Sequence, residues 1–206
     1  MALHLPPTES DLPPAVAGPA FLRDGTEVWV RSLQPEDRSL IDEFLAHASE
    51  EALTLRGFAS LRPAVTGAEA VARSSPQDRL CLLVLGDRSD RITVLGTGEY
   101  VRLAPGATVA EVGILVDEPY QGLGIATLLL ARLARAALGF GILRFEARVG
   151  TENPEMLEVF RGSGQRCSEG SSEGEVDLLI PLSPQAGERG CTTAGPPTTT
   201  GPAVGR

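Results

Sequence analysis

The spacing of apolar residues along the chain predicts a set of short strands. Residues 27–33 alternate between apolar and polar side chains, which is typical of a strand with one buried face. Residues 80–85 form a continuous apolar run and indicate a fully buried strand. Further strands are predicted at 92–103, 109–116, 143–149 and 176–182. Turn sequences join three of these strands in succession, which predicts an antiparallel meander. Gly96 and Gly98 indicate bending or a close approach of another backbone.

Helical spacing of apolar residues occurs at three places between these strands. Pro35, which two acidic residues follow, is typical of a helix start. A longer helix is predicted over 122–139, with Arg132 on its exposed side. A third helix is predicted to begin after Asn153, whose side chain would cap it, and a short helix is expected at 68–73. The order of strands and helices indicates an α+β fold.

The two ends of the chain differ in composition from its middle. Residues 1–20 are rich in proline and lack periodicity, and residues 183–206 are dominated by Gly, Pro and Thr. Such segments bury too little apolar surface to offset the entropy that ordering costs. We therefore expect a flexible N-terminal tail at 1–20, one folded domain at 21–182 and a disordered C-terminal tail at 183–206.

Charge and composition narrow the classes of partner. The formal net charge of −9 argues against nonspecific binding to nucleic acid or to anionic membranes. It suits a cationic partner such as an amine, and it serves solubility equally well. No run is long enough for a membrane span, and the N-terminus does not have the pattern of a signal peptide. Cys81, Cys167 and Cys191 have neither metal-like nor disulfide-like spacing, so we expect a reducing, cytoplasmic setting and no metal.

A glycine-rich turn stands between the strand at 109–116 and the long helix. It reads Gln121-Gly122-Leu123-Gly124-Ile125-Ala126-Thr127. A turn that opens a helix presents backbone N–H groups at the positive end of the helix dipole, and glycines let a ligand come close. The turn is therefore predicted to bind phosphate. It has neither the Rossmann spacing nor the Gly-Lys-Ser/Thr of a Walker loop, and a plain strand-to-helix turn is the alternative.

In this context, residues 121–126 resemble the Gln/Arg-x-x-Gly-x-Gly/Ala motif of the GNAT acetyltransferase superfamily. The resemblance covers residues 21–182, including an apolar strand with an acid at its head, the motif, a Leu/Ala helix and an alternating strand. The stretches 22–25 and 31–37 are similar to the opening of bacterial protein lysine acetyltransferase domains. The resemblance implies a mixed, mostly antiparallel sheet flanked by helices, with acetyl-CoA as co-substrate.

The same resemblance implies which residues hold acetyl-CoA. Backbone N–H groups of the turn would bind the pyrophosphate, and the preceding strand would pair with the pantetheine arm like an added strand. Asn153 would contact a pantetheine amide as well as cap its helix. The implied binding residues are Ile114, Leu115, Val116, Gln121, Gly122, Leu123, Gly124, Ile125, Ala126, Thr127 and Asn153.

Glu111 is the candidate general base. A lysine-like ammonium has a pKa of about 10.4, so a nearby group must take its proton before the amine can attack. Glu111 interrupts an apolar strand, where burial would raise the pKa of its carboxyl group. In many GNAT proteins a glutamate near this position is the base. The alternative is a solvated residue at a strand start, and Glu99 in the preceding strand is the second candidate for the base.

Two positions depart from the family pattern. Phe160 stands where the family often has a tyrosine that protonates the leaving thiolate, and Gln165 stands where an aromatic residue is usual. A thiol with a pKa of about 8.5 can leave as thiolate without that acid. The sequence therefore predicts an acetyl-CoA-dependent N-acetyltransferase for a primary amine, with a protein lysine among the acceptors. An acyl-CoA-binding module with little turnover and a small-molecule amine acetyltransferase stay open as alternatives.

Overall fold

The computed structural model describes residues 12–13, 15–47, 72–88, 91–162, 168–172 and 174–183. Most of the helix expected at 68–73 lies outside these residues, as do Gln165, Cys167, Cys191 and nearly all of the expected C-terminal tail.

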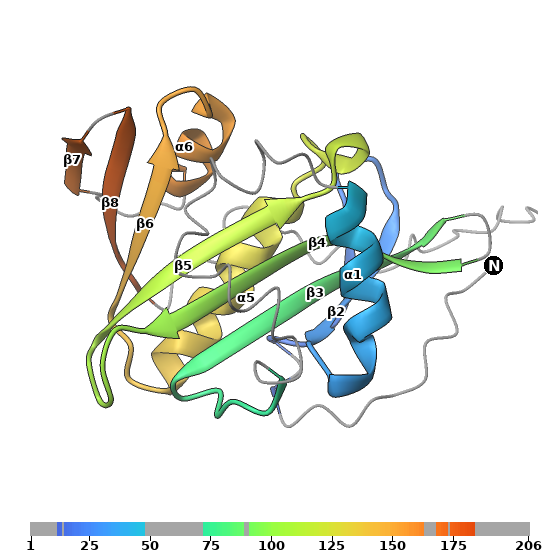
Figure 1. The fold of residues 1–206 in the computed structure, drawn as a ribbon, viewed down its shortest axis with the longest axis horizontal. Helices are drawn as coiled ribbons and strands as arrows, with labels where there is room; N and C mark the ends of the chain where they lie inside the picture. Colours follow the sequence, from blue (N-terminus) through green and yellow to red (C-terminus); the bar gives the residue numbers. More distant parts are fainter. Residues whose placement is uncertain are drawn as a thin grey trace, which may run out of the picture.

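Within the described residues the centre of the molecule is one eight-stranded sheet with the order β1-β2-β3-β4-β5-β6-β8-β7 (Figure 1). Strands β1 to β5 are antiparallel neighbours, β5 pairs with β6 in parallel, and the remaining pairs are antiparallel. This topology confirms the predicted meander and the α+β class. The strands are β1 (Gly18–Phe21), β2 (Glu27–Ser32), β3 (Arg79–Arg88), β4 (Arg91–Arg102), β5 (Val109–Val116), β6 (Arg144–Gly150), β7 (Ser168–Ser172) and β8 (Glu175–Pro181).

Helices cover the two faces of the sheet, with α1 in front of it and α5 behind it in the view of Figure 1. Helix α6 packs its apolar residues into the same core as α5. In the described part of the chain no helix combines the length and the apolar character that a membrane span requires. The helical elements are η1 (Pro35–Asp37), α1 (Arg38–His47), η2 (Glu118–Tyr120), α5 (Ile125–Gly139) and α6 (Pro154–Arg161).

Helix α5 lies directly on the backbone of β4. A Cβ atom at Gly96 would lie 2.8 Å from Cγ2 of Ile125, and one at Gly98 would lie 3.0 Å from Cδ1 of Leu133. The two glycines predicted bending or a close approach of another backbone, and what approaches them from α5 are the side chains of Ile125, Leu129 and Leu133. Because Ile125 is the first residue of α5, this contact fixes where the helix begins and where the preceding turn lies.

The N-terminal segment is better ordered than its composition indicated. Leu12 and Val16 are buried in the main core, and β1 begins at Gly18, so the expected flexible tail does not extend to residue 20. Arg132 was expected on the exposed side of its helix. Its guanidinium instead donates hydrogen bonds of 3.0–3.2 Å to the carbonyl oxygens of Val16, Gly18 and Pro19. These carbonyl contacts need no apolar periodicity, which explains why the pattern did not reveal them.

Strands β5 and β6 diverge partway along their length (Figure 1). Their pairing register ends at Glu111 and Glu146, whereas β5 continues to pair with β4 as far as Val116. The side of β5 that faces away from β4 therefore has no partner strand over residues 112–116 among the described strands. This divergence positions the site described next, because the glycine-rich turn follows directly after that stretch of β5.

Candidate functional site

The glycine loop, Gln121–Thr127, connects η2 to helix α5. Gly122 has a φ of +74° and Gly124 a φ of +93°, a backbone conformation that side chains other than glycine rarely adopt. The helix predicted from 122 in fact begins at Ile125, with Gly124 as its N-cap. Gly122 and Gly124, the left-handed residues on either side of Leu123, curve the chain. The chain therefore enters the helix from a turn rather than from an extended strand.

The Gln121 N–H at the start of this loop donates to Glu118 O at 3.2 Å, whereas the N–H groups that follow have no acceptor in the described part of the chain. Leu128 N–H donates to the carbonyl oxygen of Gly124 at 3.0 Å, which is the first hydrogen bond of α5. Within the described residues, no acceptor receives a hydrogen bond from the N–H groups of residues 122–126. Five N–H groups at a helix N-terminus form the kind of donor set that binds phosphate oxygens. The loop thus has the donor set of a phosphate-binding loop.

A cavity of about 510 Å³ opens in front of the glycine loop. Its walls come from the end of β5, from the loop, from the first turn of α5 and from α6. Of the residues expected to bind acetyl-CoA, eight line this cavity: Val116, Gln121, Gly122, Gly124, Ile125, Ala126, Thr127 and Asn153.

The other three expected residues have side chains elsewhere. Ile114 packs in the core beneath α5, Leu115 packs beneath α1, and Leu123 packs against the main core. Their contribution to a ligand site is limited to backbone groups. Asp117 N–H donates to Leu95 O in β4, so strand alternation points the N–H and C=O of Ile114 away from β4, toward the diverging β6.

Asn153 has the structural role that the sequence predicted. Its Oδ1 accepts a hydrogen bond of 3.1 Å from Met156 N, which confirms the N-cap of α6. Because the cap uses the side-chain oxygen, the side-chain NH₂ group remains a donor on the cavity wall.

The two candidate carboxylates lie on the sheet face that α1 covers, and their environments differ. Glu111 is only half-buried and stands beside Glu146 of β6 in register. Glu99 is 3% exposed, lies opposite Gly113 of β5, and accepts a hydrogen bond from Nε of Arg79. Burial raises the pKa of Glu99 to about 7, despite the opposing effect of the Arg79 charge. The second candidate is thus the buried one, and the pKa shift expected for Glu111 is found at Glu99.

Tyrosines do not supply an evident acid. Phe160 is buried in the core and carries no hydroxyl group. Tyr100 is also buried and donates its hydroxyl hydrogen to Pro76 O, and burial raises the pKa of its phenol. Tyr120 lines the cavity beside the glycine loop, at the phosphate end.

One further residue of the cavity was missed by the sequence analysis. Arg23, in the turn between β1 and β2, lies next to Gly122 and Gly124 although 99 residues separate it from Gly122. The sequence included this segment, residues 22–25, in the family resemblance and gave no indication that it meets the glycine loop.

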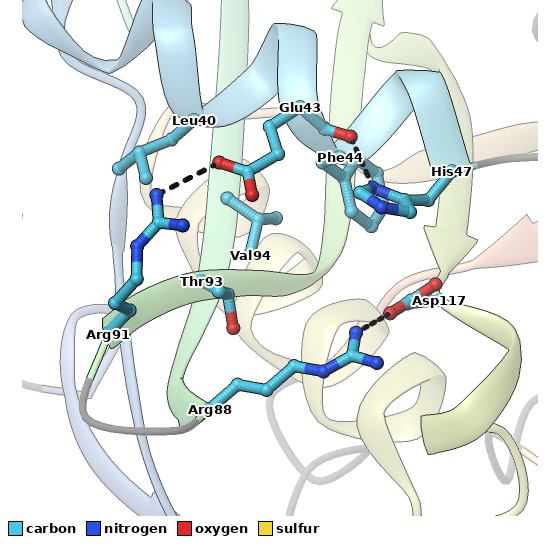
Figure 2. A pocket seen from close by; sticks show the side chains of 9 residues that line it. All are labelled: Leu40, Glu43, Phe44, His47, Arg88, Arg91, Thr93, Val94 and Asp117. Atoms are coloured by element: carbon cyan, nitrogen blue, oxygen red, sulfur yellow. Dashed lines mark hydrogen bonds and ion pairs between the residues drawn. The ribbon is translucent and has the colours of Figure 1, made fainter.

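A second, smaller cavity of about 270 Å³ lies between α1 and the β3–β4 hairpin and contains none of the expected site residues. Figure 2 shows Arg91 turned toward Glu43 and Arg88 toward Asp117 across this cavity. The N–O separations are 3.6 and 3.9 Å, so each guanidinium already has a carboxylate partner. Among the described residues no group of three or more His, Cys, Asp or Glu side chains gathers in metal-binding geometry.

Comparisons with known proteins agree with this geometry. A model of the acetyltransferase (GNAT) family matches residues 38–164. The crystal structure of the GNAT domain of S. lividans PAT superposes with a TM-score of 0.70 and 29% identity, over 84% of this chain and all of that domain. The cAMP-binding acyltransferase from Mycobacterium smegmatis superposes with a TM-score of 0.57 and 25% identity over 82% of this chain.

A relative known by sequence is the acetyltransferase Pat of Mycolicibacterium smegmatis, which is 39% identical over 66 residues. That match covers 32% of this chain and 20% of Pat. The chain also spans only 48% of the cAMP-binding acyltransferase. The shared part is therefore one region of longer proteins. The stretch that the family model matches contains the glycine loop and α5.

Proposed function

Because the chain belongs to the acetyltransferase (GNAT) family, we propose that it transfers an acetyl group from acetyl-CoA to a primary amine. The leading acceptor is a protein lysine, as the resemblance of residues 22–25 and 31–37 to bacterial protein lysine acetyltransferase domains implies. A reducing, cytoplasmic setting is part of the proposal, and the one cysteine in the described residues, Cys81, is a buried thiol.

The observation that carries the proposal is the row of unused N–H groups at residues 122–126, which face a cavity large enough for the phosphates and part of the pantetheine arm. Acetyl-CoA supplies an activated acyl group. Transfer of this group to an amine forms an amide and releases the free thiol of CoA. We assign the pantetheine arm to the side-chain NH₂ of Asn153 on the cavity wall and to the backbone of Ile114. The Ile114 N–H, on the open side of β5, is the donor we assign to the acyl oxygen.

A carboxylate on the α1 side of the sheet takes the proton of the acceptor ammonium. We propose Glu99 as this base, acting through water. With a pKa near 7, its carboxyl group is partly ionised at neutral pH and is basic enough to accept a proton. Glu111, the base that the sequence favours, then attracts the cation. It stands beside Glu146 in register, and two carboxylates at neighbouring strand positions attract cations; Arg148 of β6 is one positive charge that already interacts with Glu111.

An acyl-CoA-binding module with little turnover is the second candidate, and the buried Phe160 in place of a tyrosine acid favours it. One assay separates the two. The protein is incubated with acetyl-CoA and lysine peptides, N-terminal peptides, polyamines or free amino acids, and release of the CoA thiol is measured. The 206 residues contain no lysine, so every acetyl-lysine that is detected belongs to the added substrate.

Binding is measured beside turnover by thermal shift with CoA, NAD and ATP. The proposal predicts stabilisation by CoA alone and thiol release with at least one amine. Stabilisation by CoA without any amide product would favour the binding module. Absence of stabilisation by CoA would overturn both functions.

A further inference from the structure

We propose that Arg23 is a phosphate-binding residue of the coenzyme site and that the β1–β2 turn is part of that site. The proposal rests on the function proposed above. It adds a charged side chain to a site that the motif describes only in terms of backbone groups.

Arg23 is attached to the glycine loop at two points. Its backbone N–H donates to Leu123 O at 3.1 Å, and its Nη1 donates to Gly122 O at 3.2 Å. The turn that carries it is itself braced, because Thr26 N–H donates to Oδ1 of Asp24 at 3.0 Å. The guanidinium is therefore held beside the loop by hydrogen bonds, and it does not depend on a ligand for its position.

The side chain of Arg23 also lies over Gly124, the N-cap residue of α5. A Cβ atom at Gly124 would be 3.5 Å from both Cγ and Nε of Arg23. An anion that accepts hydrogen bonds from the N–H groups of residues 122–126 therefore comes within reach of this guanidinium. Arginine offers further N–H donors in a planar fork that matches phosphate oxygens, beyond the one used by Gly122.

The charge of Arg23 has no partner in the described part of the chain. Arg31, Arg79 and Arg148 each have a carboxylate within ion-pair distance, whereas no described carboxylate pairs with Arg23. It is also the one basic residue among the described lining residues of the cavity, whose far wall carries Glu155 and Glu158. A pyrophosphate brings two negative charges into this cavity, and Arg23 is the cation that offsets them.

The test compares Arg23→Gln, Arg23→Lys and the control Arg38→Gln by titration calorimetry. Glutamine removes the charge and keeps a donor only as far out as arginine Nε, whereas lysine keeps the charge, so the comparison of the two variants separates the charge from the tether. Arg38 is an exposed residue of α1 outside the cavity, and its substitution removes the same unit of charge. Each variant is titrated with CoA, dephospho-CoA and pantetheine at low and at moderate salt concentration.

We expect Arg23→Gln to bind CoA about tenfold more weakly, with a shallower dependence on salt, and to bind pantetheine as the wild type does. Arg23→Lys should recover most of the affinity, and Arg38→Gln should match the wild type. A loss that disappears with dephospho-CoA assigns the contact to the 3′-phosphate, and a loss that persists assigns it to the pyrophosphate.

Equal affinity of wild type and Arg23→Gln for CoA overturns the proposal and leaves the acetyltransferase function intact. An equal loss for CoA and pantetheine also overturns it, because it shows that Arg23 only supports the loop. If the wild type binds none of the three ligands, the proposed function fails, and the role of Arg23 fails with it.

Discussion

The two halves of the proposed site are built differently: one is the glycine loop, and the other is the carboxylate face, defined by Glu99 and Glu111 on the α1 side of the sheet. The loop acts through backbone N–H groups, whose direction is set locally by two glycines of positive φ and by the helix that follows. The carboxylate face acts through side chains, whose proton affinity depends on what other strands place around them. A local motif can therefore locate the first half, whereas only the tertiary structure ranks the residues of the second.

The largest expected effect tests that ranking directly. Glu99→Gln removes the carboxylate with the pKa near 7 and should lower kcat by about 10²- to 10⁴-fold, the usual contribution of a general base. In the wild type, kcat should rise with pH through about 7 and then level off, because the base must be ionised to accept a proton. Steady-state kinetics from about pH 5.5 to about pH 9 measure both quantities, because this range covers the titration of a group with that pKa.

Glu111→Gln is the matched comparison, since it removes a carboxylate from the same sheet face. It should raise KM for a cationic acceptor and keep the rise of kcat near pH 7. If Glu111→Gln abolishes the pH dependence and Glu99→Gln retains it, the ranking by burial is wrong and the sequence-based choice of Glu111 is right.

A second prediction concerns how ionisation of the same carboxylate changes the stability of the protein. Burial raises the pKa of Glu99 from 4.5 to about 7, so between these pH values the folded state holds a proton that the unfolded state has lost. This contribution to the free energy of unfolding is fully present below pH 4.5 and is lost as the pH rises through about 7. The loss is at most about 3 kcal/mol.

Urea unfolding of the wild type at several pH values should show this decline, and Glu99→Gln should lack it. The free energy of unfolding of Glu111→Gln should decline with pH as that of the wild type does, because substitution of the half-buried Glu111 leaves the burial of Glu99 unchanged. Parallel curves for the wild type and Glu99→Gln would show that Glu99 ionises in the fold as easily as in the unfolded chain.

The glycine loop can be tested with a backbone change of the same kind at two places. Gly124→Val forces a β-branched residue into a φ of +93°, so the loop must rearrange and its N–H groups lose their common direction. We expect CoA to bind about 30-fold more weakly, because each charge-assisted hydrogen bond that is lost weakens binding. Calorimetric titration with CoA measures the change.

Gly106→Val is the control, since Gly106 has a φ of +73° in the turn after β4 and nothing lies within 4 Å of its Cβ position. It should lower the melting temperature and leave the affinity for CoA unchanged. Similar losses of affinity in both variants would mean that general destabilisation, and not the loop geometry, weakens binding.

Local patterns predicted most of the strands, the meander, the glycine loop and the capping of α6 by Asn153, because each depends on residues close together in the chain. Contacts between distant segments escaped prediction. Arg79 of β3 pairs with Glu99 of the neighbouring strand β4. Arg132 donates hydrogen bonds to carbonyl oxygens in residues 16–19, which lie more than 110 positions earlier in the chain. Neither contact leaves a periodic trace, so the burial of Glu99 and the ordering of the N-terminal segment could not be deduced from the sequence.

The smallest expected effect concerns Asn153, whose single side chain has both a structural role and a proposed binding role. Its oxygen caps α6, and we propose its NH₂ group as a contact to the pantetheine arm. Asn153→Ala removes both and should cost about 1 kcal/mol of stability together with a few-fold increase in KM for acetyl-CoA. Asn153→Asp keeps a capping oxygen and removes the NH₂ donor, so it should retain the wild-type melting temperature and show the same increase in KM. If Asn153→Asp matches the wild type in both measurements, Asn153 is a structural cap alone, and the binding role belongs to the backbone of the loop and of β5.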